Sequence, residues 1–450
     1  MADAPEYFWG WNRLAEWYFD NGAREPFLAA ARKLVELEPD YAVSHGNLAA
    51  ALMRMADATA EQRSKHLADA QRALERSVQL DADYLYGHAE LFDLCLANDD
   101  LATADIELVA LARLEPDAPN TLSRRAQLAA ARGDLTTGGA ALMQLLKQPL
   151  PYAWPLDTAL AALEKLPHGR VVCEGLLGAA ASQEADPPEQ VVRSWVGLCQ
   201  RTHGWGTCVR RLRRWRGSEA AYKTAADELL ILMGKNSVAT LLRWFVWRNR
   251  RRLAADNHLW ARVGWALINH RRNHAARRWL ADWQGRADLD TWPLLLVAIA
   301  LQADGRADEA VLANRRALER PRDEFSARHA ALLAGEELVA GRTAAARALL
   351  PPVDELRGHD YYEAVARLVG AALQIAEEFA AGTRTSSTAA RRRLAIAVRE
   401  APADFGRDQP FDLLWHRLLW RIASDQGLWW LAAASRLRVA LLRVEIALRR

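Results

Sequence analysis

The feature that most constrains the fold of this chain is a pattern of residues that returns after 34 positions. Leu14 is matched by Leu48, and the triplet DDL at 99–101 returns as GDL at 133–135. A repeat of this length is typical of one helix-turn-helix unit. Such a unit cannot bury its apolar face alone, so consecutive units must stack on one another. The repeat therefore predicts an all-α chain of antiparallel helix pairs.

The same step recurs later in the chain. Trp260 is matched by Leu294, and Gly264 by Ala298. The segment at 305–321, GRADEAVLANRRALERP, then has the apolar spacing of a second helix that seats on a neighbour. Strand-like alternation of apolar and polar residues is missing throughout the sequence. We therefore expect a solenoid built wholly of helices.

The first unit also carries a family signature. WNRLAEWY places Trp11, Leu14, Ala15 and Tyr18 at the spacing W-x2-L-G-x2-Y. On these residues the chain resembles the tetratricopeptide repeat (TPR) family, over about residues 8–150 and 257–355. The resemblance implies an α-solenoid, a TPR-like superhelix, in which the first helix of each pair lines a concave groove that holds the ligand.

Helix-breaking stretches divide the chain. PLPYAWP at 149–155 and the polar SQEADPPEQ at 182–190 interrupt the helical pattern, and ADATAEQRSKH at 56–66 adds nine residues that we interpret as an enlarged turn. We expect four segments: an N-terminal TPR array at 1–150, divergent helical pairs at 151–256 that are basic and rich in tryptophan toward their end, a second TPR array at 257–355, and a C-terminal helical segment at 356–450.

The C-terminal segment is unusually apolar for the end of a solenoid. An amphipathic helix begins at residue 360, a loop AAGTRTSST follows, and two apolar-rich helices fill Phe411 to Arg450 with a hinge near residues 425–427. A terminal repeat needs a polar outer face, so these helices predict docking. Three outcomes are open: they pack back on the array, pair with another copy to form a homo-oligomer, or lie on an anionic membrane.

Composition narrows the class of protein. The chain has 450 residues, of which 51% are hydrophobic and 26% charged, so it can bury a substantial core. Its start lacks the pattern of a secretory signal, no stretch is long and apolar enough to span a bilayer, and the four cysteines form no CxxC pair. We therefore expect a cytoplasmic protein. Only six of the 59 basic residues are lysine, a bias typical of a GC-rich bacterial genome.

Charge is polarised along the chain. Basic and acidic residues number 16 and 29 in residues 1–192, 20 and 5 in residues 193–286, and 23 and 22 in the remainder. Nine of the 18 tryptophans also fall in the basic middle segment. Arginine binds carboxylate and phosphate and stacks on aromatic rings, so the segment suits an acidic protein surface, single-stranded nucleic acid or anionic lipid.

The densest part of this segment is LLRWFVWRNRRRL at 241–253. Its arginines are Arg243, Arg248, Arg250, Arg251 and Arg252. Cations are favoured at a helix C-terminus, so a scaffold helix end explains the stretch without a ligand. VRRLRRWR at 209–216 and NHRRNHAARRW at 269–279 repeat the theme, however, and three such segments favour a stripe that contacts an acidic partner.

The TPR resemblance also implies which side chains face the groove. In the first array these are Tyr86, Asn120, Arg124 and Gln127, and in the second His258, Arg262, Trp265, Asn269 and Trp292. The TPR subfamily that clamps carboxylate tails needs lysine or another polar residue where this chain has Gly46 and Ala89. That departure argues against a binder of chaperone tails.

Patterns of catalysis and metal binding are absent. MGKNS at 233–237 resembles the end of a phosphate-binding loop, but it lacks the earlier glycine and has Asn236 where Ser or Thr is needed. His270 and His274 are four residues apart, but neighbouring arginines disfavour a cation. Asp93 and Glu90 are interpreted as surface or packing groups of a helix. We expect no enzyme activity, no cofactor and no metal.

Together these observations predict an adaptor or scaffold. Its concave groove binds a protein or peptide partner, and its basic, tryptophan-rich segment meets an acidic surface. The alternative is a helical-repeat protein that binds nucleic acid.

Overall fold

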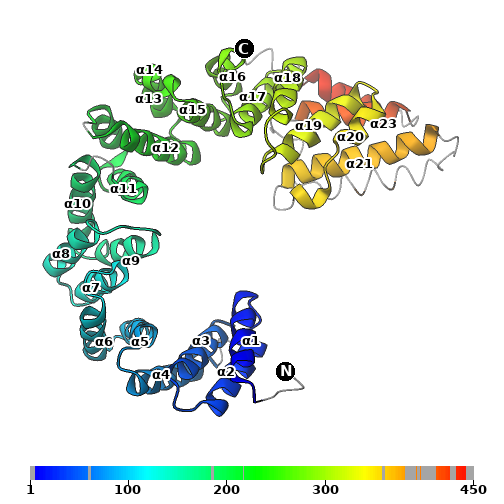
Figure 1. Cartoon of the computed structure of the whole chain (residues 1–450). Coiled ribbons are helices and arrows are strands. Elements are labelled where there is room, and N and C mark those ends of the chain that lie inside the picture. The colour runs from blue at the N-terminus through cyan, green and yellow to red at the C-terminus, as the bar shows by residue number, and fades with distance from the viewer. Residues whose placement is uncertain are drawn as a thin grey trace. The chain divides into compact units, whose positions relative to one another are not determined.

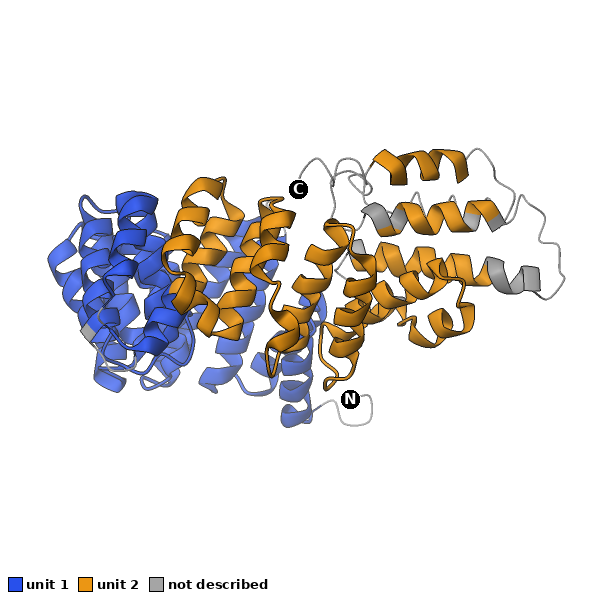
Figure 2. Cartoon of the chain, turned by 90° about the horizontal axis from the view of Figure 1, so that it is seen from above, with its two compact units in different colours: residues 1–225 blue, residues 226–450 orange. Residues whose placement is uncertain are grey.

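The chain is described by a computed structural model that covers residues 6–58, 62–183, 187–215, 217–356, 360–380, 392, 396, 412–425 and 432–441. Every regular element of this part of the chain is a helix (Figure 1). The helices form two compact units, residues 1–225 and residues 226–450 (Figure 2). The prediction of an all-α chain is confirmed.

Unit 1 is a series of helices in which each packs on the next from α1 to α11. They are α1 (Phe8–Asp20), α2 (Arg24–Leu37), α3 (Ala42–Ala58), α4 (Arg63–Leu80), α5 (Leu85–Ala97), α6 (Leu101–Leu114), α7 (Pro119–Ala131), α8 (Leu135–Leu145), α9 (Trp154–Leu163), α10 (Gly169–Gln183) and α11 (Glu189–Arg213). α7 also contacts α9, and α8 contacts α10, which is how successive pairs of a solenoid stack. α12 (Glu219–Lys235) crosses from unit 1 into unit 2.

The helix starts reproduce the step seen in the sequence. α1 and α3 begin at residues 8 and 42, and α5 and α7 begin at 85 and 119. The extra residues at 56–66 lie between these two sets. The enlarged turn that we expected there is wrong in extent, because α3 continues to residue 58 and α4 begins at residue 63.

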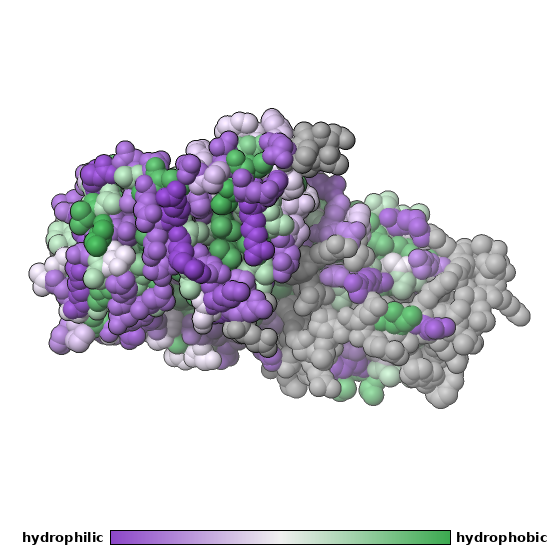
Figure 3. Space-filling view, turned by 90° about the horizontal axis from the view of Figure 1, so that it is seen from below, coloured by the Kyte–Doolittle hydropathy of each residue, from purple (hydrophilic) through white to green (hydrophobic). Residues whose placement is uncertain are grey.

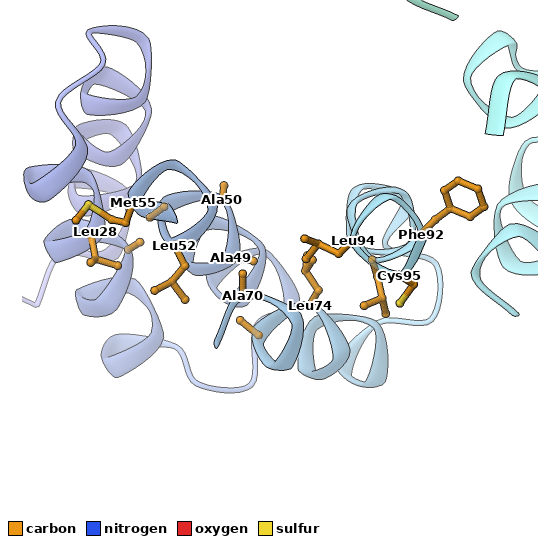
Figure 4. Close-up of a cluster of buried hydrophobic side chains, with 14 of the residues drawn as sticks. Leu28, Ala49, Ala50, Leu52, Met55, Ala70, Leu74, Phe92, Leu94 and Cys95 are labelled. Carbon is orange, nitrogen blue, oxygen red and sulfur yellow. The ribbon is translucent and has the colours of Figure 1, made fainter. Parts of the chain in front are cut away.

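Small side chains let the helices of unit 1 approach closely. In the buried cluster of Figure 4, Ala49 of α3 and Ala70 of α4 are fully buried where these two helices meet. Leu74 of α4 lies beside Leu94 of α5. The side chain of Phe92 points away from α4, from the opposite side of α5. Such interlocked layers of alanine and leucine are the dominant stabilising term in a solenoid.

Gly46, one of the departures from the carboxylate clamp, has a structural reason. A Cβ atom at this position of α3 would collide with the hydroxyl group of Tyr84, which precedes α5. Gly87 is crowded in the same way, since its Cβ would lie 2.8 Å from Tyr84 Cδ1. The ring of Tyr84 therefore occupies the space that a longer clamp residue would need.

Two aspartates begin equivalent helices at the repeat distance. The backbone N–H of Thr103 donates to Asp100 Oδ1 at 3.1 Å, and that of Thr137 donates to Asp134 Oδ1 at 3.0 Å. These caps satisfy N–H groups that a helix start leaves without intrahelical partners. Gly133, with φ of 74°, makes the preceding turn.

α11 is two helical segments joined at Gly204. Gly204 has φ of 74° and ψ of 170°, a conformation that favours glycine, and it breaks the helix in its second half. The second segment carries most of VRRLRRWR. The divergent region that we expected at 151–256 is therefore helical in its described parts, with this break as its main irregularity.

Unit 2 continues the same architecture. Its elements are α13 (Ala239–Arg248), α14 (Arg250–Ala255), α15 (Asn257–Asn269), α16 (Asn273–Trp279), η2 (Trp283–Gly285), α17 (Thr291–Ala303), α18 (Ala307–Leu318), α19 (Ser326–Val339), α20 (Thr343–Leu349), η3 (Val353–Leu356), α21 (Asp360–Ala380) and α23 (Asp412–Asp425). Residues 432–441 are also helical. α17 packs on both α15 and α18, and α19 packs on α18 and α20. α15 and α17 begin at residues 257 and 291, again one repeat apart.

Trp260 fills the centre of the α15–α16 pair. Its indole N–H donates to the carbonyl of Trp279 at 3.2 Å, and the indole N–H of Trp279 donates to the carbonyl of Trp260 at 2.8 Å. Leu280 packs where Gly264 lacks a side chain, since a Cβ there would lie 2.8 Å from it. Both tryptophans therefore pack within this helix pair.

The described part of the C-terminal segment packs back on unit 2. α23 contacts α19, α17 and α21, and its Leu414, Leu418 and Leu419 are buried. Gly335 of α19 leaves room for them, and Arg417 donates to the buried carboxylate of Glu336 at 2.9 Å. The loop at 381–388 and the residues after 441 lie outside the described residues. Pairing with a second copy stays a prediction.

Figure 3 shows one face of the described residues, on which hydrophilic side chains predominate. On the face shown in Figure 3, apolar residues form small areas separated by hydrophilic ones. Within the described residues, no helix is both long and apolar enough to cross a membrane.

Candidate functional site

Three of the predicted groove residues of unit 2 meet around an aspartate on the neighbouring helix. His258 Nε2 lies 2.9 Å from Asp227 Oδ1, and Arg262 Nε donates to the same oxygen at 2.6 Å. Asp227 belongs to α12, whereas His258 and Arg262 lie one turn apart on α15. Trp292 of α17 stacks near His258, with ring centroids 5.3 Å apart.

Asp227 is a buried carboxylate held in its charged form. Its side chain is 6% exposed. Burial acts to raise the pKa of Asp227, but the hydrogen bond from His258 and the charge of Arg262 outweigh it, so the pKa is lowered. The aspartate therefore neutralises Arg262 and fixes its guanidinium in place.

Two indole rings flank that guanidinium. The Cζ of Arg262 lies 5.5 Å from the ring centroid of Trp265 and 4.7 Å from that of Trp292. Trp265 of α15 packs against α12 at Gly234, which has no side chain. A Cβ atom on Gly234 would lie 2.5 Å from Trp265 Cζ3. Cation–π contacts of this kind add stability and orient the rings. We name the five residues Asp227, His258, Arg262, Trp265 and Trp292 the Asp227 cluster.

The cluster offers flat aromatic surface with one exposed polar group. The side chain of His258 is 56% exposed, whereas that of Arg262 is only 18% exposed. Trp265 and Trp292 are half-buried, and Asn269 lies exposed at the end of α15. Anchored aromatic rings beside a few polar groups are the usual composition of a binding hot spot.

The predicted groove residues of unit 1 show a related arrangement. Arg124 of α7 donates to both carboxylate oxygens of Asp93 on α5, at 3.1 and 2.6 Å. Its Cζ also lies 5.4 Å from the ring centroid of Trp154. Burial raises the pKa of Asp93, and Arg124 opposes that shift. The interpretation of Asp93 as a packing group fits these contacts.

The other three predicted residues of unit 1 lie near this pair in the chain. Tyr86 lies on α5 with 39% of its surface exposed, and desolvation of its hydroxyl group by the surrounding protein raises the pKa of that group. Gln127 donates to Ser123 Oγ at 3.3 Å within α7. The side-chain oxygen of Asn120 is buried and accepts no hydrogen bond from a described residue.

The basic segment divides into two kinds of arginine. Arg262, Arg277 and Arg286 each form an ion pair with an aspartate of unit 2. The charge of these three arginines is therefore balanced within unit 2. Arg243, Arg248, Arg250 and Arg251 are exposed and form no ion pair with a residue that the structure describes. Arg252 is half-buried and has an interaction partner.

Two of the unpaired arginines share the exposed face of α13 with two tryptophans, and the other two follow at the start of α14. Leu242, Phe245 and Val246 form the buried face of α13. The opposite face carries Arg243, Trp244, Trp247 and Arg248, at positions i, i+1, i+4 and i+5. Trp244 is 39% exposed and Trp247 68% exposed. With Arg250 and Arg251 of α14, we name these residues the basic aromatic face.

Whether a continuous stripe joins all three basic segments stays a prediction. Residues 209–215 belong to unit 1, whereas 269–279 belong to unit 2. Arg277 also forms an ion pair with Asp304, with 2.6 Å between Arg277 Nε and Asp304 Oδ2.

Sequence reasoning missed Asp227, Gly234 and Trp154. Asp227 precedes His258 by 31 residues, and Asp93 precedes Arg124 by the same number. Asp227 precedes its arginine, Arg262, by 35 residues, so an acid about one repeat before a groove arginine was a usable signal. It was overlooked because the region around α12 shows poor register in the sequence.

Metal binding finds no support among the described side chains. No group of three or more His, Cys, Asp or Glu residues within them could hold a metal ion. His270 and His274 have different partners: His270 Nε2 lies 2.9 Å from the carbonyl oxygen of Met233, and His274 Nδ1 lies 3.5 Å from Asp304 Oδ1.

Comparisons with known proteins bear on the fold alone. No family model and no curated protein matches this chain. Similar solved structures include a tetratricopeptide repeat protein from Parabacteroides merdae, with 11% identity, 72% of this chain and 97% of that chain covered, and a TM-score of 0.27. The Cut9–Hcn1 hetero-tetramer of APC/C matches at 11% identity, with 98% and 90% covered and a TM-score of 0.29. The TPR domain of P58(IPK) matches at 12% identity, with 87% and 98% covered and a TM-score of 0.22. Two of these three similar structures are described as a tetratricopeptide repeat protein or domain.

Proposed function

We propose that this chain is a helical-repeat scaffold that binds a protein partner with an acidic surface. The observation that carries the proposal is the basic aromatic face. Its four arginines remain exposed without ion pairs to described residues, although many other arginines of the chain are paired. Exposed tryptophan beside unpaired arginine matches the composition of protein interfaces, which are enriched in both.

The Asp227 cluster supplies the second contact of the proposed scaffold. Its arginine is already neutralised by Asp227, so the cluster attracts a partner through indole surface rather than through charge. A peptide side chain that is apolar or aromatic fits such a surface. The proposal therefore assigns long-range attraction to the basic aromatic face and specific contact to the cluster.

Charge reversal tests the role of the basic aromatic face. The full chain is titrated with a fluorescein-labelled peptide of glutamate residues flanked by tryptophan, at several salt concentrations. Arg243→Glu with Arg250→Glu should lower the affinity about tenfold or more, because two attractive contacts become repulsive. Arg24→Glu with Arg32→Glu is the matched control, since both residues are exposed on α2, unpaired with described residues and outside all three basic segments. Equal affinity of both variants would refute the proposal.

The same titration separates protein from nucleic acid. Exposed tryptophan and arginine also suit stacked bases, so a single-stranded oligothymidine is the second probe. If it binds more tightly than the peptide, with log affinity falling by about 0.7 per contacted phosphate for each unit of log salt, the nucleic-acid alternative replaces our proposal.

Trp265→Ala tests the cluster. Trp265 is half-buried, so its loss should weaken peptide binding more than it lowers the melting temperature. Trp260→Ala is the control, because Trp260 is fully buried and should chiefly cost stability. A variant that melts much earlier but binds normally would show that Trp265 is only structural.

A further inference from the structure

A cavity of about 610 Å³ lies in unit 1 between α10 and the two segments of α11. It is separate from both surfaces of the proposed function, because neither contributes a residue to it. Its volume falls in the range of small-molecule sites, about 300–1,000 Å³. What it could bind follows from the glycines, charges and rings that line it.

Glycines keep the cavity open. Gly204 breaks α11, so that its second segment turns away from the first. On α10, a Cβ at Gly178 would lie 2.9 Å from Trp195 Nε1, and a Cβ at Gly175 would meet no atom within 4 Å. A larger residue at Gly175 would thus project into empty space. Glycine within a helix costs about 1 kcal/mol relative to alanine, so its presence there calls for a reason.

A buried glutamate, Glu174, contacts three side chains at one wall of the cavity. Glu174 is 3% exposed. Trp195 Nε1 donates to it at 2.9 Å, His203 Nε2 lies 3.2 Å away, and Arg211 forms an ion pair with it. Arg211 is therefore neutralised within the protein, and Trp195 is held with its ring at the edge of the cavity.

Two further arginines of the cavity have no acidic partner among the described residues. Arg210 and Arg214 line the cavity and form no ion pair with a described residue; Arg210 donates only to Thr207 Oγ1, at 2.9 Å. Arg210 lies in the last turn of α11 and Arg214 caps its C-terminus four residues later, a spacing at which like charges repel each other. An anion bound between them would remove that repulsion and complete their hydrogen bonds.

Aromatic rings form the remaining wall. The ring centroids of Trp195 and Trp215 lie 5.2 Å apart with an interplanar angle of 50°. Trp215 is fixed by a hydrogen bond from its Nε1 to the carbonyl of Ser218, at 3.2 Å. A flat apolar group can therefore pack against rings that need no rearrangement.

We propose that this cavity binds a small organic anion, a phosphate monoester or carboxylate attached to a flat apolar body. Arg210 and Arg214 hold the anionic group, and Trp215 contacts the apolar body. The anion comes either from a free metabolite or from a modified side chain of a peptide, since both present the same chemistry. The site does not depend on the proposed scaffold function.

Phenyl phosphate is the first probe, titrated into the full chain by isothermal calorimetry. We expect saturable binding to one site, with inorganic phosphate binding more weakly because it lacks the ring. Arg210→Glu with Arg214→Glu should lower the affinity about tenfold or more. Arg213→Glu is the matched control: it is exposed on the same helix, unpaired with described residues and outside the cavity, so it should stay within about twofold.

A steric variant tests the cavity without a change of charge. Gly175→Leu should fill the open space and abolish binding of phenyl phosphate, while helix content by circular dichroism stays the same. Val171→Leu, on the same helix and outside the cavity, is its control. If wild-type protein fails to bind either phenyl phosphate or benzoate, or if every variant binds them equally, the proposal is overturned.

A phosphotyrosine peptide identifies the source of the anion. Tighter binding of the peptide than of phenyl phosphate supports a modified side chain, whereas equal or weaker binding supports a free metabolite. Loss of both with Gly175→Leu supports the cavity in either case.

Discussion

Removing the carboxylate of Asp227 tests how the cluster around it is held together. Asp227→Ala would leave Arg262 between two indole rings without its counter-charge. A hydrogen bond to a charged group contributes about 1.5–3 kcal/mol, and breaking a fully buried ion pair costs about 3–5 kcal/mol. Arg262 retains 18% exposure, and His258 can turn to solvent. We therefore expect a loss of about 3 kcal/mol in the free energy of unfolding.

Urea denaturation of the full chain, followed by circular dichroism, measures the loss. Hydrogen exchange of peptides from α12 and α15 locates it, because a repeat array can open locally. Glu324→Ala is the control, since Glu324 is exposed, lies outside any helix and forms no ion pair with a described residue; it should change stability by less than about 0.5 kcal/mol. Combining Asp227→Ala with Arg262→Leu should recover part of the loss, because the unpaired charge is then gone.

The pH dependence supplies a second check on the same reasoning. The pKa of Asp227 is lowered in the folded state, so its contribution is present above the ordinary pKa of aspartate, about 3.9, and is lost as pH falls through the folded value. Wild type and Asp227→Ala should therefore converge in stability at low pH. A loss below about 1 kcal/mol at neutral pH, or a difference that does not change with pH, would refute the reasoning.

Three further outcomes are expected. Gly234→Ala should lower the free energy of unfolding by about 1–2 kcal/mol, because the added Cβ meets the ring of Trp265. Gly175→Ala should raise it by about 0.5–1 kcal/mol, because its Cβ meets no atom within 4 Å. Urea denaturation of both variants should therefore show changes of opposite sign. Burial lowers the pKa of His329 to about 4, so stability should fall by about 2 kcal/mol between pH 7.5 and pH 5, and His329→Gln should flatten this slope. Deleting residues 411–450 uncovers α19 and leaves the buried Glu336 without Arg417, so light scattering should detect aggregation; a soluble, equally stable truncation would contradict the back-packing of α23.

The sequence predicts the architecture well because repeat length and apolar spacing are local properties. The helix starts at 8 and 42, at 85 and 119, and at 257 and 291 follow from that spacing. The insertion at 56–66 was misread because extra residues can lengthen helices as easily as a turn. The break at Gly204 was also missed, because one glycine within a helical pattern does not reveal a left-handed conformation.

The candidate site was predictable only in part. Register placed His258, Arg262, Trp265 and Trp292 on consecutive first helices, and the structure brings them together. Their common partner, Asp227, lies in a region where the repeat pattern is weak. Which arginines are neutralised inside the protein depends on contacts across about 30 residues or more, and composition alone cannot distinguish Arg262 from Arg243.

In both units, a groove arginine is held by an ion pair to an aspartate and by a contact with a tryptophan ring. In unit 1, Arg124 pairs with Asp93 one repeat earlier and lies over Trp154 about one repeat later. In unit 2, Arg262 pairs with Asp227 and lies over Trp292. Each such arginine joins three successive first helices, so its contribution is to the register of the stack rather than to attraction of a partner. Attraction then falls to exposed arginines that have no acidic partner among the described residues, as is the case for those of α13 and for Arg250 and Arg251 of α14.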